Sequence, residues 1–200
     1  PVTDIDQRDI RDTLAPIWHN KADTARKAMN RLSIVLRHAA ALGLDVDLQA
    51  TEKAKALLGR TRHVAKHIPA MAWADVPEFY ASLGEPALTH LALRLLMLNP
   101  GVRSKPLRHL RLEQIEDEVW TVPEGDMKGQ KGRAPAYRVP LCKEAQRIIE
   151  LARPHARNGY LFANTRGGVI SDMTLSRLME RRGLEARPHG FRTSLRTWLA

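Results

Sequence analysis

Apolar residues in the first sixty positions recur at helical spacing. A first helix is predicted over residues 4–18 by four apolar positions, Ile5, Ile10, Leu14 and Ile17. Pro16 should end this helix early. A second helix is predicted over residues 23–42, where Asp23 or Thr24 can cap the start and Gly43 stops the end. Its apolar stripe consists of Met29, Leu32, Val35, Leu36 and Ala39. A short helix over about 51–58 completes a predicted all-α domain at residues 1–60.

The pattern changes after residue 58. Residues 59–71, GRTRHVAKHIPAM, are basic and have no helical periodicity, so we interpret residues 61–72 as an interdomain linker. Two helices are predicted next, over residues 73–83 and 85–99. The second is almost wholly apolar and is therefore expected to be buried. Asn99, Pro100 and Gly101 then break the chain.

Three short β-like segments follow, at residues 112–115, 119–122 and 137–141. An acidic turn separates the first two and a Gly/Lys-rich loop the last two, which predicts a small three-stranded antiparallel sheet. Helices are predicted again over residues 143–152, over 171–182 with Gly183 as a stop, and from 188 onward. The expected fold is mostly α, with an α+β second domain at residues 73–200.

The net charge points to the class of partner. Lys and Arg number 32 and Asp and Glu 22, which gives a net charge of +10. A polyanion is therefore the leading partner, and nucleic acid is favoured over a membrane because no stretch is long and apolar enough to span one. The alternative is a protein that is only soluble and basic. The single cysteine, Cys142, excludes an internal disulfide, fits a reducing cytoplasm and is expected to be a core residue.

Several basic residues lie outside the predicted apolar stripes. They form either an ordinary solvated surface or contacts to nucleic-acid phosphates. The candidates for phosphate contact are Arg26, Lys27 and Arg31 on the second helix, Arg62 and Lys66 in the linker, Lys131 in the Gly/Lys-rich loop, and Arg177 and Arg181 on one later helix.

The end of the sequence, RPHGFRTSLRTWLA, combines a cationic and an apolar face. On a helix, His189, Arg192 and Arg196 fall within an arc of about 60°. We expect His189 in the first helical turn, where free backbone N–H groups and the helix dipole favour an anion such as a phosphate. The adjacent apolar stripe, which should pack on the core, is Phe191, Leu195 and Trp198.

Two further cations lie near predicted turns. Gly101 permits a tight bend, and Arg103 is held between that bend and a segment anchored by leucines. Lys128 and Lys131 belong to the loop between two predicted strands, where a flexible hairpin can place an ammonium group over a bound phosphate.

Taken in order, these cations resemble the catalytic residues of tyrosine recombinases of the phage and genomic-island integrase branch. Gly101 and Arg103 match the Gly-x-Arg motif of the family, and Leu107 and Leu110 match the leucines that follow it. Lys128 matches the lysine of the β-hairpin. His189 and Arg192 match the His-x-x-Arg motif. The helical first third is similar to the SAM-like core-binding domain of the family. The resemblance implies that residues 73–200 form a catalytic domain with the DNA breaking-rejoining fold.

The resemblance also implies a mechanism. A tyrosine attacks a DNA phosphodiester, forms a 3′-phosphotyrosyl link and frees a 5′-hydroxyl, so neither ATP, a metal nor any other cofactor is needed. Arg103 and Arg192 would hold the non-bridging oxygens of the scissile phosphate, where charge grows in the transition state. Lys128 would protonate the leaving 5′-oxygen, and His189 would accept a proton from the nucleophile or hydrogen-bond the phosphate.

The sequence departs from the family pattern at two places. Pro106 stands at a usually acidic position, which affects the support of Arg103. The nucleophilic tyrosine is expected some tens of residues beyond His-x-x-Arg, whereas this sequence ends at Ala200. Tyr80, Tyr137 and Tyr160 are expected to be packing residues. We therefore expect a chain truncated before its nucleophile, which binds duplex DNA without forming a covalent adduct.

Three functions remain open at this point. The first is a site-specific recombinase that lacks its C-terminal piece, and the second is a naturally short DNA-binding regulator or decoy. The third, an RNA-binding protein, is disfavoured by an aromatic content of 5%. The implied partners are double-stranded attachment-site DNA, further copies in a homotetramer of the full-length protein, and accessory DNA-bending proteins. This chain itself is expected to be a monomer in the bacterial cytoplasm, associated with the nucleoid and not with a membrane.

Overall fold

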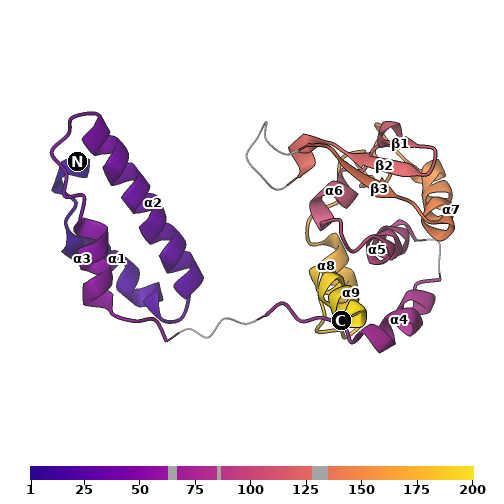
Figure 1. Ribbon diagram of the computed structural model, residues 1–200, viewed down its shortest axis with the longest axis horizontal. Coiled ribbons are helices and arrows are strands. Elements are labelled where there is room, and N and C mark those ends of the chain that lie inside the picture. Colours follow the sequence, from indigo (N-terminus) through magenta and orange to yellow (C-terminus); the bar gives the residue numbers. More distant parts are fainter. Residues whose placement is uncertain (63–66, 85–86, 128–134) are drawn as a thin grey trace. The chain divides into compact units, whose positions relative to one another are not determined.

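The computed structural model describes residues 1–62, 67–84, 87–127 and 135–200. The chain forms two compact units, Pro1–Lys66 and His67–Ala200, each with its own hydrophobic core (Figure 1). In the described part of the chain, no helix combines the length and the apolar character needed to cross a membrane.

The first unit is entirely helical. Its elements are a short 3₁₀ turn η1 (Val2–Asp4) and the helices α1 (Gln7–Trp18), α2 (Ala22–Ala41) and α3 (Ala50–Leu58). Helix α1 packs against both α2 and α3. The indole Nε1 of Trp18 is 2.9 Å from the carbonyl oxygen of Gly59, to which it donates a hydrogen bond. The core residues of this unit are Ile10, Leu14, Trp18, Ala25, Met29, Leu36, Ala50 and Ala54.

The first two helices differ from their predicted ends. Asp6 caps α1 by accepting from the backbone N–H groups of Arg8 and Asp9, so the helix starts at Gln7. Pro16 does not end it, because burial of Trp18 stabilises the last turn and Lys21 N–H still donates to the Ile17 carbonyl.

Helix α2 starts earlier than predicted. Lys21 is its N-cap, and Asp23 lies inside the first turn instead of capping it. Val35 is exposed, since α1 and α3 cover only the other face of the helix.

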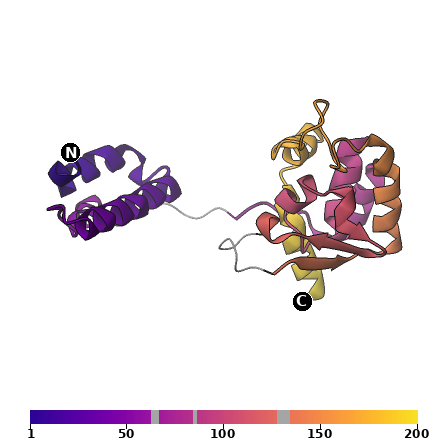
Figure 2. The ribbon, with the colours of Figure 1, turned by 90° about the horizontal axis from the view of Figure 1, so that it is seen from above.

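The second unit surrounds the buried helix α5 (Leu88–Leu98), which confirms the predicted burial of this segment. Its other helices are α4 (Val76–Ser82), α6 (Ser104–Arg108), α7 (Lys143–Ala152), α8 (Thr174–Arg181) and α9 (Phe191–Leu199). Helix α5 contacts α6, α7 and α8, and in Figure 1 it lies between the sheet and α4. Figure 2 shows the same unit from above, turned by 90° from the view of Figure 1.

The sheet of the second unit is antiparallel, with the order β1-β2-β3, as predicted. Its strands are β1 (Ile115–Glu116), β2 (Val119–Val122) and β3 (Tyr137–Pro140). Trp120 and Val122 alternate with half-buried neighbours, so one face of β2 belongs to the core.

Several boundaries in this unit differ from the prediction. Strand β1 is short because the 3₁₀ turn η3 (Leu112–Gln114) precedes it. The helix expected from 73 begins as the 3₁₀ turn η2 (Trp73–Asp75), and α8 starts at Thr174 instead of 171. Cys142 is exposed and not in the core, since it follows the buried Leu141 at the end of an extended segment.

The apolar stripe predicted on the last helix is only partly buried. Phe191 packs in the core against Phe79, with ring centroids 6.2 Å apart. Leu195 and Trp198 keep 37% and 60% of their surface exposed. They line an apolar hollow at the surface together with Trp73 and Val76, and no described residue covers it.

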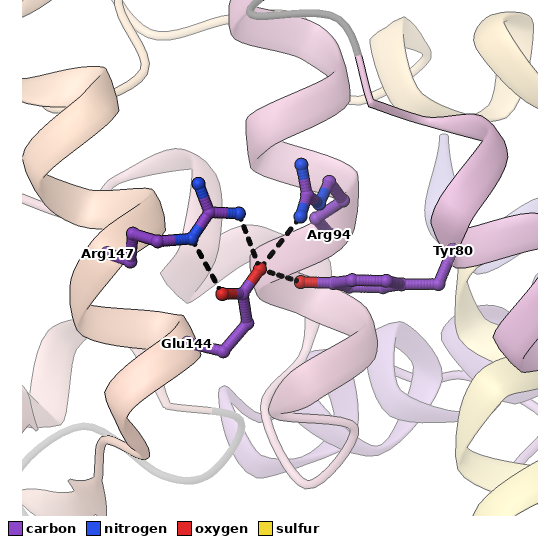
Figure 3. Close-up of polar contacts among 4 residues, drawn as sticks. All are labelled: Tyr80, Arg94, Glu144 and Arg147. Carbon is purple, nitrogen blue, oxygen red and sulfur yellow. Dashed lines mark hydrogen bonds and ion pairs between the residues drawn. The ribbon is translucent and has the colours of Figure 1, made fainter.

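A charged cluster joins α4, α5 and α7 (Figure 3). The carboxylate of Glu144 accepts hydrogen bonds from Arg147 at 2.7 and 2.9 Å, from the Tyr80 hydroxyl at 2.8 Å and from Arg94 at 2.7 Å. The Arg94 guanidinium also lies over the Tyr80 ring. Donors from Arg147 and Tyr80, with the charge of Arg94, lower the pKa of Glu144 from 4.5 to about 2. The cluster is therefore charged over most of the pH range.

We predict that Glu144→Gln lowers the free energy of unfolding at neutral pH by about 1–2 kcal/mol, because it leaves the buried Arg94 without its carboxylate. Since the folded pKa is depressed, this stabilisation is present above the unfolded pKa of about 4.5 and is lost as the pH falls toward 2. Urea unfolding of both proteins between pH 7 and pH 2 measures it.

Glu150→Gln is the matched control, because Glu150 pairs with Arg153 at the solvent-exposed surface of the same helix. This variant should unfold within about 0.5 kcal/mol of the wild type. A Glu144→Gln effect that is equally small, or that does not shrink at low pH, would contradict the role given to the cluster.

Candidate functional site

The turn before Arg103 is built by Asn99. Its backbone carbonyl accepts from Val102 N–H at 2.9 Å, and its buried side-chain amide donates to the Leu95 carbonyl at 3.0 Å. Val102 and Leu107 are buried on either side of Arg103, which serves as the N-cap of α6 with an extended backbone. The Arg103 side chain is exposed. The turn thus fixes the backbone of Arg103 while its guanidinium faces solvent.

Helix α6 is attached to the sheet by Lys105, next to the unusual Pro106. The ammonium group of Lys105 lies 2.9 Å from the Gly125 carbonyl and 3.3 Å from the Asp126 carboxylate, both in the 3₁₀ turn η4 (Glu124–Asp126). Arg108 adds a hydrogen bond of 2.8 Å to the Ile170 carbonyl. Pro106 itself is buried. The segment after Arg103 is therefore well supported without an acidic residue at position 106.

The start of α9 is held by the backbone of residues 69–71. Arg187 N–H donates to the Pro69 carbonyl at 3.1 Å, and the Ser194 hydroxyl donates to the Met71 carbonyl. A Cβ atom on Gly190 would lie 2.5 Å from the Pro69 carbonyl oxygen and 2.8 Å from the Ala70 Cα. Only glycine fits at this position, and the close approach sets where α9 begins.

The sequence predicts His189 in the first turn of the last α-helix. The structure places it instead in the 3₁₀ turn η6 (Pro188–Gly190), which precedes that helix. The turn forms because Gly190 N–H donates to the Arg187 carbonyl at 2.8 Å, which places His189 just outside α9. The His189 side chain is exposed.

Helix α9 brings cations to the turn before Arg103. Arg192 and Arg196 line a hollow of about 590 Å³ together with Pro100 and Gly101. Arg196 follows Arg192 by one helical turn, and this spacing predicts their shared face. The family pattern does not include Arg196, so this spacing is the only signal for it in the sequence. The hollow joins Arg192 to the segment that leads into Arg103.

The predicted catalytic cations with described positions, and Arg196, are not neutralised by nearby carboxylates, and two of them, Arg192 and Arg196, line the hollow. In the described ranges, the side chains of Arg103, His189, Arg192 and Arg196 form no hydrogen bond or ion pair. Other arginines of the unit are paired with glutamates at 2.7–3.2 Å, namely Arg94, Arg147, Arg153 and Arg187. The hollow therefore carries positive charge that is available to an anion from outside.

The remaining predicted site residues are placed as follows. Lys128, Lys131 and Lys66 lie outside the described residues. Arg26, Lys27 and Arg31 are exposed on α2, in a different unit from Arg192. Arg26 is also engaged by Asp23 at 3.1 Å.

The other predicted phosphate contacts, Arg62, Arg177 and Arg181, lie within the described residues. Arg62 is exposed, and its backbone N–H donates to His19 Nδ1 at 3.4 Å. Arg177 and Arg181 are exposed on α8, and neither side chain has a hydrogen-bonding partner among the residues with described positions. Both arginines are thus free to meet a phosphate.

The three tyrosines differ in environment. Tyr80 is part of the Glu144 cluster, and the Tyr160 ring lies under the Arg111 guanidinium at 4.7 Å. Both are packing residues, as expected. Tyr137 is 41% exposed, so the expectation that it packs is wrong. It is the first residue of the edge strand β3, and a Cβ atom on Gly101 would lie 3.4 Å from its hydroxyl oxygen.

Comparison with known proteins identifies the family. The sequence pattern of the phage integrase family matches residues 71–200. The chain belongs to this family. The match covers the second unit from Met71 onward, including the Arg103 turn and the Arg192 helix. No curated protein matches the chain.

Solved integrase structures share the fold. A lambda integrase dimer bound to a COC′ core site has a TM-score of 0.70 and 19% identity, with 97% of this chain and 73% of that chain covered. A lambda integrase tetramer bound to a Holliday junction has the same TM-score and identity, with 97% and 59% covered. The Tn1549 transposon integrase with circular intermediate DNA has a TM-score of 0.65 and 14% identity, with 100% and 74% covered. The phage integrase fold is thus shared at low identity.

We predict that Gly190→Ala destabilises the protein by about 1–3 kcal/mol, because the added Cβ clashes with the backbone of Pro69 and Ala70. Chemical denaturation measures the change. Gly125→Ala is the matched control, since a Cβ there meets no atom within 4 Å. Equal stability of Gly190→Ala and Gly125→Ala would show that the close contact does not constrain α9.

Proposed function

We propose that this phage integrase family member is the DNA-binding and catalytic part of a site-specific recombinase that acts on duplex attachment-site DNA. One observation carries the proposal most directly. Arg192 shares a hollow with the Pro100–Gly101 turn that precedes Arg103, and both arginines lack a carboxylate partner among the described residues. An unpaired cationic hollow of this kind suits a phosphodiester better than an uncharged ligand.

In the proposed reaction, Arg103 and Arg192 hold the non-bridging oxygens of the scissile phosphate. A tyrosine oxygen attacks the phosphorus, the bond to the 5′-oxygen breaks, and Lys128 gives that oxygen a proton. His189 accepts the proton of the tyrosine hydroxyl or hydrogen-bonds the phosphate. The reverse reaction with another strand's 5′-hydroxyl exchanges the strands. Each arginine stabilises negative charge that grows in the transition state, so its loss should slow cleavage by about 10²–10³-fold.

The first unit is proposed to be the core-binding domain. Its exposed Arg26, Lys27 and Arg31 lie along α2, where they can meet successive phosphates of a duplex. On DNA the full-length protein would act as a homotetramer, with accessory DNA-bending proteins at the attachment site. The chain alone is proposed to be monomeric in the bacterial cytoplasm and associated with the nucleoid.

The proposal predicts a steep salt dependence of duplex DNA binding. Each phosphate neutralised by a cation contributes about −0.9 to the slope of log K against log salt. Arg192→Ala should weaken binding and make the slope shallower by about 1, because one phosphate contact is removed. Fluorescence anisotropy with a labelled mixed-sequence duplex at several salt concentrations measures both quantities.

Arg153→Ala is the control for the loss of one positive charge. Arg153 is neutralised by Glu150 at 2.7 Å and is not among the residues that line the hollow, so this variant should keep the wild-type slope. Equal slopes for Arg192→Ala and the wild type, or a flat salt response of the wild type, would refute the phosphate site.

We predict that the chain forms no covalent phosphotyrosyl adduct, and the environments of two of its three tyrosines support this prediction. The hydroxyl of Tyr80 is bonded to Glu144, and Tyr160 is stacked under Arg111. Incubation with a nicked duplex that traps the cleaved product, followed by denaturing electrophoresis, should show no protein–DNA band. A band that survives denaturation would contradict this prediction, and its loss in Tyr137→Phe would identify the attacking residue.

A further inference from the structure

Tyr137 has no function in the mechanism described above, yet its hydroxyl lies next to Gly101, which lines the hollow. The hydroxyl makes no hydrogen bond with the described part of the chain, and 41% of the residue surface is exposed. Tyr80 and Tyr160 are different, since each has a partner that accounts for its position. A half-exposed tyrosine whose hydroxyl lacks a partner is able to contact a ligand.

Two rigid segments determine where this hydroxyl lies. Tyr137 pairs with Val122 in the β2–β3 ladder, so its backbone is fixed at the start of the edge strand. Gly101 belongs to the turn anchored by Asn99, and a side chain there would begin 3.4 Å from the Tyr137 hydroxyl oxygen. The hydroxyl therefore lies against the turn that leads into Arg103.

The same turn forms one wall of the cationic hollow. Pro100 and Gly101 line it on one side, and Arg192 and Arg196 line it from α9. A phosphate bound there would offer oxygen atoms that accept from both guanidinium and hydroxyl groups. Tyrosine hydroxyls are among the neutral groups that proteins use to contact DNA phosphates.

We propose that the Tyr137 hydroxyl donates a hydrogen bond to a phosphate oxygen of the DNA backbone bound at this hollow. The proposal rests on the proposed function, since it assumes that the hollow binds DNA. It assigns Tyr137 as a DNA-binding residue, which orients the phosphate for Arg103 and Arg192 but is not the attacking group.

Fluorine NMR tests the contact directly. The chain has three tyrosines, so incorporation of 3-fluorotyrosine gives three signals, and Tyr137→Phe identifies the one from Tyr137. On addition of a mixed-sequence DNA duplex at low salt, the Tyr137 signal should shift while those of Tyr80 and Tyr160 stay in place. A Tyr137 signal that does not move when the duplex is bound would overturn the proposal.

Binding measurements separate a hydrogen bond from a charge contact. Tyr137→Phe should weaken duplex binding roughly 5-fold at every salt concentration and leave the slope unchanged, because no charge is removed. Tyr160→Phe is the matched control, since it removes the same hydroxyl group away from the hollow, and it should bind as the wild type does. Unchanged affinity of Tyr137→Phe would also overturn the proposal.

The outcomes distinguish this proposal from the one on which it rests. If Arg192→Ala weakens binding and Tyr137→Phe does not, the phosphate site stands and only the role of Tyr137 fails. If neither variant changes binding, or the wild-type chain does not bind the duplex, both proposals fail. A covalent DNA link at Tyr137 would contradict the binding role, because it would make Tyr137 the nucleophile.

Discussion

The close contact between Gly190 and the backbone of residues 69 and 70 is the constraint on which the candidate site depends. Because no side chain fits between them, the segment 187–190 lies directly against residues 69 and 70, which are near the start of the second unit. The hydrogen bonds from Arg187 to Pro69 and from Ser194 to Met71 hold the same contact from both sides. Helix α9 therefore starts at a fixed place, and Arg192 faces the Pro100–Gly101 turn as a result.

The distribution of ion pairs gives the site its charge. Glutamates neutralise several arginines of the second unit, most fully in the cluster around Glu144. That cluster joins three helices and contributes to stability, whereas the cations at the hollow contribute nothing comparable and repel one another in the absence of an anion. A surface that keeps unpaired arginines together is best explained by a ligand that supplies the missing negative charge, and a DNA phosphate does so.

The sequence predicted the elements of the fold well because periodicity reflects burial. The apolar run around Leu91 predicted a buried helix, and the β-like segments predicted the three-stranded sheet. Element ends were less accurate, since they depend on tertiary contacts such as the burial of Trp18 beyond Pro16. Periodicity also predicted that Trp198 is buried, whereas its side chain is exposed. The position of a residue on a helix predicts which face its side chain belongs to, but not whether another element covers that face.

The site was predictable in part. Residue spacing and family resemblance pointed to Arg103, His189 and Arg192. The position of Tyr137 could not be predicted, because only the pairing of β3 with β2 brings its hydroxyl next to Gly101. The same holds for Lys105, whose hydrogen bond to the Gly125 carbonyl joins segments twenty residues apart in sequence.

A double-mutant cycle of Arg103→Ala and Arg192→Ala tests the central claim, that the two arginines hold one phosphate. Duplex DNA affinity is measured for the wild type, both single variants and the double variant. If both guanidinium groups bind the same phosphate, the double variant should lose less affinity than the sum of the single losses, with a coupling of about 1 kcal/mol. Losses that add without coupling would show that the arginines bind separately and would contradict the claim.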